Sequence, residues 1–284
     1  MSQQLILKDK VLAGIDSLPS LSPAVQDIIV VSNDVTSTPK DLLEIIRKDP
    51  VLTVKILKLV NSAYFSLSNR VVSLNRALVL LGFNTIKNIA ISSELVKFSE
   101  SSPKNPYFQY HELWEHMVSV GATSKLMAKA SGEERKNLEE YFIAGLIHDL
   151  GDFMMMRFVP KEFHRIREFA LDKNMSVKEC SQQVLGFSSG EMGGELARQW
   201  KLQDHLQRII INVGEEDDEA EKLDKVVWIA DKFCRQNEVG YVNDRTRLDI
   251  LSEELVAVGL KESFFEDYGP EMFDSINKAK VFIN

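Results

Sequence analysis

The sequence predicts an all-α, multi-helical protein, and three features of the 284-residue chain support this prediction. Apolar residues recur at helical spacing through nearly the whole sequence. A residue suited to cap a helix stands directly before a proline at Ser22-Pro23, Thr38-Pro39 and Asp49-Pro50, and this pairing is typical of helix starts. Stretches with β propensity such as Ile28–Val31 lack the alternating pattern of a hairpin.

The N-terminal part is predicted to form about five helices. Three of them begin at the capped prolines, and Thr38 with Asp41 resembles a capping box with Asp in place of Glu. A fourth, over Leu74–Leu81, is expected to stop at Gly82, because glycine favours the position just after a helix. Thr85–Phe98 is predicted to form the fifth.

The prolines at 103 and 106 mark the clearest break in the chain. They divide it into an N-terminal helical lobe, residues 1–102, and a larger lobe, residues 103–284. The break is too short for a flexible linker, so we expect the two lobes to pack together. Helices are predicted in the larger lobe at Phe108–Ala130, Asn137–Phe158, Lys161–Asp172, Val177–Leu185, Gly190–Trp200, Asp204–Val213, Lys222–Gln236, Arg245–Val258 and Pro270–Phe282.

Composition and charge exclude several classes of protein. The chain carries 34 basic and 42 acidic residues, a net charge of −8, which argues against general binding to nucleic acid or to anionic lipid. A local basic face stays open, although no basic cluster with interleaved aromatic residues indicates one. No apolar run approaches the ~18 residues of a membrane span, and no signal-peptide pattern is present. Cys180 and Cys234 are expected to be free thiols in a reducing cytoplasm.

An apolar stretch over Tyr141–Asp152 carries the most informative polar residues. It contains the adjacent pair His148-Asp149, followed by Gly151 and Asp152. A buried polar group without a partner costs ~1–3 kcal/mol, so this pair is expected either to bind a metal or to form a hydrogen-bonded network.

Three segments of the N-terminal part resemble the HDOD family, the HD-related output domain of bacterial signalling proteins. They are LPSLSP at Leu18–Pro23, KDPVLTVKILKLVNSAYF at Lys48–Phe65 and VVSLNRALVLLGFNTIKNIAI at Val71–Ile91. LWEHM, GLIHDLGD and GELARQW follow in the family's order, and the resemblance covers roughly residues 12–214. It implies an all-α HD-type fold, a stand-alone HDOD chain whose C-terminal helices complete the HD-like lobe, and a non-enzymatic role in signalling or scaffolding.

The related HD phosphohydrolases hold a divalent metal with a His, an adjacent His-Asp pair and a distant Asp. The matching residues here are His116, His148, Asp149 and Asp231. Such a set suits one zinc, manganese or iron ion. Each residue alone could equally be a core side chain bonded to its neighbours, and the four could satisfy one another without metal.

Three departures from the family's pattern argue against hydrolysis. Asp152 stands where many HD enzymes have lysine, Ser189 replaces a frequent histidine, and Val213-Gly214 stand where relatives have a His-His pair. The histidines missing at Ser189 and at Val213-Gly214 would be the ligands of a second metal ion, so their absence argues against one. The acidic run Glu215–Glu219 would oppose a phosphate if it bordered the site, although such runs are usually solvated loops.

The leading hypothesis is therefore a non-catalytic signalling or scaffold protein with a degenerate HD site, acting on a protein partner of a bacterial signalling pathway. The alternatives are a single-metal phosphohydrolase acting on a nucleotide or cyclic dinucleotide, and a ligand sensor without turnover. Tyr64, Phe65 and Leu67 are candidate partner-binding residues, although they could instead fill the seam between the lobes.

Overall fold

The chain folds into a bundle of helices, as the sequence predicts. The computed structural model describes residues 3–17, 21–34, 36–65, 67–100, 104–173, 175–212, 219–241 and 249–282, with the backbone alone for residue 3 and for 94–100. The described residues contain no strand. Their helices are α1 (Gln3–Ser17), α2 (Pro23–Asn33), α3 (Pro39–Arg47), α4 (Pro50–Val60), α5 (Leu74–Glu100), α6 (Tyr110–Ala130), α7 (Leu138–Ile147), α8 (Leu150–Phe158), α9 (Pro160–Lys173), α10 (Val177–Leu185), α11 (Ser189–Gln199), α12 (Asp204–Ile211), α13 (Lys222–Gln236), α14 (Ser252–Ala257), α15 (Phe264–Ala279) and the 3-10 turn η1 (Lys280–Phe282).

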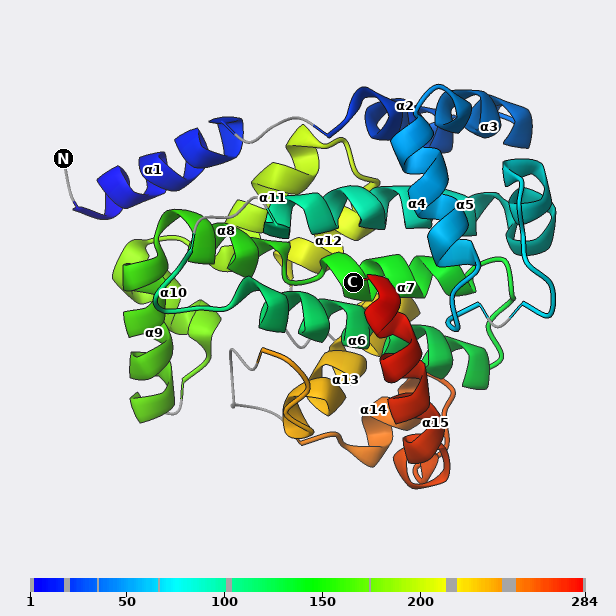
Figure 1. Cartoon of the computed structure of the whole chain (residues 1–284). Helices are drawn as coiled ribbons and strands as arrows, with labels where there is room; N and C mark the ends of the chain where they lie inside the picture. The colour runs from blue at the N-terminus through cyan, green and yellow to red at the C-terminus, as the bar shows by residue number, and fades with distance from the viewer. Residues whose placement is uncertain are drawn as a thin grey trace.

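The capped prolines begin helices at the predicted positions. Pro23, Pro39 and Pro50 are the first residues of α2, α3 and α4. The Thr38 amide donates to Asp41 Oδ2 at 2.8 Å, and Asp49 Oδ1 accepts from the Leu52 amide at 2.9 Å. Helices α2, α3 and α4 lie together at one end of the molecule (Figure 1) and pack on α5 or on one another. In α5 the backbone leaves helical geometry at Gly82, with φ +84°, so the predicted stop is a kink between two helical segments.

Helix α6 is the centre of the fold. It packs against α7, α13 and α15, and nearly all of its residues from Leu113 to Ala128 are buried. Two glycines allow α6 and α7 to approach closely, because a Cβ atom added to Gly145 would lie 2.7 Å from the Cα of Gly121. Helix α8 meets α11 through a similar contact.

The prediction of one helix over Asn137–Phe158 is wrong. The chain breaks at His148-Asp149 into α7 and α8, and Asp149 adopts φ −99° and ψ 22°. The break has a packing reason, since α7 lies along α6 whereas α8 turns to lie along α11. It leaves the His-Asp pair at the junction of the two helices.

Two C-terminal boundaries also differ from the prediction. Helix α14 begins at Ser252 rather than Arg245, because the Leu251 amide bonds Glu254 and starts the helix there; residues 242–248 lie outside the described part. Helix α15 begins at Phe264, before Pro270, where Phe265 stacks on Phe233 with ring centroids 4.8 Å apart.

No helix is predicted over residues 3–17, where the structure has α1. This helix buries only a short apolar ridge that includes Val11 and Ile15, and it packs against α8, α10 and α11 (Figure 1). Its contacts therefore lie beyond the predicted boundary at residue 102, and the division into two lobes stays a prediction. Among the described residues, no helix is both long enough and apolar enough to cross a bilayer.

A candidate His-Asp site

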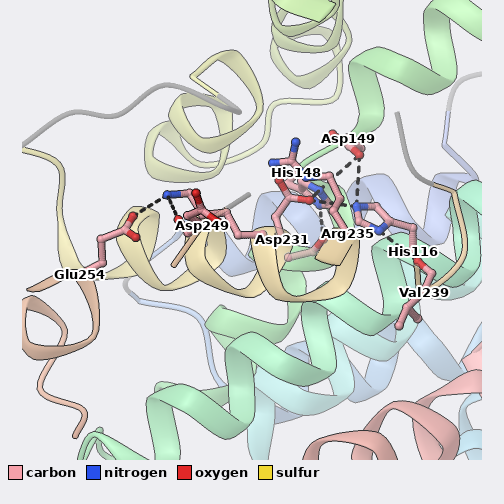
Figure 2. A network of polar contacts seen from close by, with 10 residues as sticks. His116, His148, Asp149, Asp231, Arg235, Val239, Asp249 and Glu254 are labelled. Atoms are coloured by element: carbon pink, nitrogen blue, oxygen red, sulfur yellow. Dashed lines mark hydrogen bonds and ion pairs between the residues drawn. The ribbon is translucent and has the colours of Figure 1, made fainter. Parts of the chain in front are cut away.

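Three separate parts of the chain bring the four predicted site residues together. His116 lies in α6, His148 and Asp149 lie at the break between α7 and α8, and Asp231 lies in α13 (Figure 2). All four are buried, with exposed fractions of 0%, 1%, 3% and 4%. Apolar neighbours in these helices place the side chains in the core, so the polar atoms must satisfy one another or bind a ligand.

The ring nitrogens of the two histidines face the two carboxylates. His116 Nε2 lies 3.1 Å from Asp231 Oδ1 and 3.6 Å from Asp149 Oδ2. His148 Nε2 lies 3.3 Å from Asp149 Oδ2 and 3.7 Å from Asp231 Oδ1. The sequence resemblance therefore selected four residues that form one compact polar cluster.

Each histidine uses its other nitrogen on a backbone carbonyl. His148 Nδ1 lies 2.6 Å from the Gly145 oxygen, and His116 Nδ1 lies 3.3 Å from the Val239 oxygen. A carbonyl can only accept, so the proton belongs on Nδ1 in both rings. Both Nε2 atoms then face carboxylates, which means that they carry a second proton or offer a lone pair to a cation.

Arg235 is a fifth member of the cluster that sequence reasoning missed. Its guanidinium donates to Asp231 Oδ2 from one helical turn away in α13, and only 5% of the residue is exposed. The sequence does indicate this pair in one way: Asp231 and Arg235 are four residues apart, which places the two side chains on one face of a helix. Both oxygens of Asp231 are thus engaged, one by His116 and the other by Arg235.

The charges of the cluster shift its pKa values in a consistent way. Burial alone would lower the pKa of His148, but Asp149 and then Asp231 outweigh it and raise that pKa to about 10. Burial likewise opposes ionisation of the acids. The pKa of Asp149 is nevertheless lowered, mainly by His148, and the pKa of Asp231 is held well below its usual value, mainly by Arg235.

The donor set fits a single metal ion on chemical grounds. His148 Nε2 and Asp149 Oδ2 are buried and have no hydrogen-bond partner in the described structure, despite lying 3.3 Å apart. His116, His148 and Asp149 each offer one ligand atom, and these atoms lie within 4.8 Å of one another. Nδ1 bonded to a carbonyl is also the arrangement that orients metal-binding histidines. A divalent ion would therefore be held by these three residues, with Asp231 beside them.

Two protons and one divalent ion are electrostatically equivalent in this cluster. With both imidazoles doubly protonated, His116, His148 and Arg235 balance Asp149 and Asp231 to a net charge of about +1. Neutral imidazoles and a divalent ion give the same net charge. The two forms therefore leave the cluster with the same net charge.

The residues that depart from the pattern of HD enzymes fall into two groups. Asp152 and Ser189 are buried, with exposed fractions of 3% and 6%. Val213-Gly214 and the acidic residues up to Asp218 lie outside the described residues.

The candidate partner-binding residues lie elsewhere, in the turn after α4. The Tyr64 ring lies 5.0 Å from Phe65, 5.5 Å from Phe142 and 5.1 Å from Phe282, and Lys125 Nζ is 4.8 Å from its centroid. Leu67 is half-buried against the core. The structure brings Tyr64 and Phe65 together in an aromatic contact with α7 and η1, and their partner-binding role stays a prediction.

Comparison with known proteins identifies relatives of this chain. The model of the HDOD domain family matches residues 18–215. An uncharacterized protein of Treponema pallidum (strain Nichols) is 24% identical over 188 residues, which is 66% of this chain. The match spans only 36% of that relative's length.

Solved structures share the fold. A crystal structure of an HDOD domain protein of unknown function from Geobacter sulfurreducens is 21% identical, covers 98% of both chains and has a TM-score of 0.80. A candidate phosphohydrolase from Shewanella amazonensis SB2B is 24% identical, with a TM-score of 0.71 over 96% of this chain and 98% of its own. A candidate signal transduction protein from Marinobacter aquaeolei VT8 is 17% identical, with a TM-score of 0.74 over 100% of this chain and 67% of its own.

Proposed function

The chain belongs to the HDOD domain family, and from that membership we propose that it is a non-catalytic bacterial signalling or scaffold protein. It acts in the cytoplasm by binding a protein partner. Its His-Asp cluster serves to hold α6, α7, α8 and α13 in register rather than to turn over a substrate.

The observation that carries the proposal is the ion pair between Arg235 and Asp231. In the related HD phosphohydrolases the distant Asp is itself a metal ligand, and a hydrolytic centre also needs an open coordination position for water and substrate. Here Arg235 engages one oxygen of Asp231, and His116 engages the other. No member of the five-residue cluster is more than 5% exposed, so the ligand atoms offer a phosphate little access.

The residues around the cluster support the same conclusion. Transfer or hydrolysis of a phosphate needs cations placed where negative charge develops. Asp152, three residues after Asp149 and buried, is a carboxylate rather than a cation, and the one arginine in the cluster already pairs with Asp231.

A turnover screen tests the proposal. Protein purified without chelator is analysed for metal and then assayed on p-nitrophenyl phosphate, bis-p-nitrophenyl phosphate and cyclic dinucleotides with added Zn²⁺, Mn²⁺ or Fe²⁺. We expect no hydrolysis above that of Asp149→Ala. Hydrolysis that requires the metal and disappears in Asp149→Ala would overturn the proposal.

One observation favours a second candidate, a single-metal phosphohydrolase or a metal-dependent sensor. It is the pair of unsatisfied atoms, His148 Nε2 and Asp149 Oδ2, that face each other in the core. When bound, a divalent ion would supply Lewis acidity and a bound water of lowered pKa. Stoichiometric metal without turnover would favour the sensor, and metal with turnover would favour the hydrolase.

A further inference from the structure

Residues 47–93, which include α4 and most of α5, form a basic stretch in an otherwise acidic chain. Between Arg47 and Ser93 there are seven lysine and arginine residues and a single acid, Asp49, whereas the remaining residues include 27 basic and 41 acidic ones. Asp49 caps α4 by accepting from the Leu52 amide. The stretch is therefore strongly basic within a chain of net charge −8.

Exposed apolar side chains occur in the same stretch. Among the described residues, the four most exposed large hydrophobic side chains are Val72, Val79, Val54 and Val51, at 78%, 77%, 66% and 61%. Single exposed hydrophobic residues are ordinary, but three on the neighbouring helices α4 and α5 with a fourth, Val72, just before α5 are a mark of an interaction surface.

Hydrogen bonds hold the ends of α3 and α4 beside the start of α5. Asn61 at the end of α4 accepts from the Val71 amide at 2.7 Å and donates to the Val71 carbonyl at 2.8 Å. Arg47, the last residue of α3, donates to Asn75 Oδ1 in the first turn of α5 at 2.8 Å. The end of α3 and the end of α4 are therefore both held at the start of α5, at the end of the molecule occupied by α2 to α4 (Figure 1).

Helical spacing separates this outer face from the core. In α4 the buried residues Leu52 and Ile56 alternate with exposed Val51, Val54 and Lys58. The start of α5 buries Leu74 and Ala77 and exposes the positions between them. We define the basic-apolar face by these exposed or half-exposed residues: Arg47, Lys48, Lys55, Lys58, Arg70 and Arg76, with Val51, Val54, Val72 and Val79.

We propose that the basic-apolar face is the docking surface for the protein partner, and that the partner contributes an acidic amphipathic segment. The inference rests on the proposed function, and it names the surface and the chemistry of the partner. An apolar centre surrounded by charged residues is the usual composition of a protein interface. The six cations match acidic side chains, and the four valines match apolar ones on the same segment.

Extended polyanions fit the face less well. The exposed hydrophobic residues on it are valines, whereas membrane-surface helices use tryptophan, phenylalanine and leucine, and single-stranded nucleic acid is bound by stacking on aromatic rings. Tyr64 and Phe65 are turned toward Phe142 and Phe282. The excess of acidic residues in the rest of the chain would repel a large anionic surface more than a short acidic segment.

The test uses a fluorescein-labelled amphipathic peptide with leucine on one helical face and glutamate on the other, titrated with the full chain and followed by anisotropy. We expect Lys55→Glu/Arg76→Glu to weaken binding at least about tenfold, and raising NaCl from about 50 to 300 mM to weaken it as well. Val54→Ser/Val79→Ser should weaken binding several-fold. The matched control, Lys161→Glu/Lys261→Glu, makes the same change of net charge at two other exposed lysines and should leave affinity within about twofold.

Equal affinity in the two charge-reversed variants would overturn the proposal, and so would unchanged affinity in the valine variant. Tighter binding of phosphatidylserine vesicles or of a single-stranded oligonucleotide, lost on reversing Lys55 and Arg76, would also overturn it. The turnover screen is an independent measurement. Hydrolysis combined with site-specific peptide binding would reject the proposed function alone, and absence of both hydrolysis and site-specific binding would reject the surface alone.

Discussion

Arg235 donates a hydrogen bond to Asp231 from one turn further along α13, in a region where neither residue is more than 5% exposed. The pair places a permanent cation against the carboxylate that the family resemblance assigns to metal binding. The same carboxylate approaches both histidines, which lie 3.1 and 3.7 Å away. A single side chain therefore connects the guanidinium to the two imidazoles, and changes at Arg235 should affect the whole cluster.

Removal of Arg235 is expected to destabilise the protein strongly. Arg235→Ala leaves the Asp231 carboxylate buried beside the two histidines without its guanidinium, and breaking a buried pair costs about 3–5 kcal/mol. The measurement is the free energy of unfolding in urea at pH 7 with chelator present.

A double variant separates the charge from the packing. Arg235→Met/Asp231→Asn removes both charges and keeps much of the volume, so it should recover a large part of the stability lost in Arg235→Ala. If the double variant is as unstable as the sum of its single variants, the pair is not coupled as described.

Stability of the metal-free protein should fall as the pH rises above neutrality. His148 has an unfolded pKa near 6.5 and a folded pKa of about 10, so its contribution is fully present below pH 6.5 and is lost as the pH rises through 10. One proton gives a slope of at most about 1.4 kcal/mol per pH unit. Urea unfolding between pH 6.5 and about 7.5, one unit below the usual thiol pKa of about 8.5, measures this slope.

The control for this prediction is His148→Gln, which keeps a polar side chain and removes the titration. Its stability should be lower at pH 6.5 and nearly independent of pH up to about 7.5. A wild-type protein that is equally stable at both ends of this range would contradict the raised pKa of His148.

Metal binding should release protons and should improve when Arg235 is removed. A divalent ion on His148 Nε2 displaces the proton that the carboxylates hold there, so titration calorimetry in two buffers of different ionisation enthalpy should show at least one proton released per ion. Arg235→Gln frees Asp231 as an additional ligand and should raise the affinity for Zn²⁺ or Mn²⁺ about tenfold. Affinity that is unchanged in Arg235→Gln and in Asp149→Ala would exclude the cluster as the metal site.

The sequence predicts the features that a residue imposes on its own backbone, such as the start or the interruption of a helix. Proline after a capping residue begins α2, α3 and α4, and Gly82 interrupts α5, because these residues act on their own backbone. His116 and Asp231 could be paired with His148-Asp149 only through the family resemblance, since they lie far apart along the chain.

Other features depend on tertiary packing and could not be read from the sequence. Apolar residues continue at helical spacing on both sides of His148-Asp149, from Tyr141 to Met156, so the pattern does not mark the change of direction there. Arg235 stands near the end of a helix, where a basic residue is ordinarily solvent-exposed, and burial is visible only once α13 packs on α6. The net charge of −8 describes the whole chain and does not show that residues 47–93 are basic, so it does not predict the basic-apolar face.

Close packing of α6 on α7 should make Gly145 intolerant of any side chain. A Cβ atom there would lie 2.7 Å from both the Cα and the nitrogen of Gly121, and backbone cannot move aside as a side-chain tip can. Gly145→Ala should therefore lower stability by about 1–3 kcal/mol, despite the higher helix propensity of alanine. Thermal unfolding measures the loss, and a melting temperature equal to or above that of the wild type would contradict the close approach.

The aromatic contact around Phe282 is expected to hold the turn after α4 against the rest of the protein. Phe282 is 5% exposed and lies 5.1 Å from Tyr64, 6.4 Å from Phe65 and 5.0 Å from Phe142, measured between ring centroids. Phe282→Ala should cost about 3–5 kcal/mol and should speed amide hydrogen exchange in residues 61–65. Phe273→Ala is the matched control, because Phe273 is 42% exposed in α15 and should leave exchange in that turn unchanged. If Tyr64 and Phe65 instead serve mainly as partner anchors, Phe282→Ala should leave their exchange rates near those of the wild type, and the protein should lose little stability.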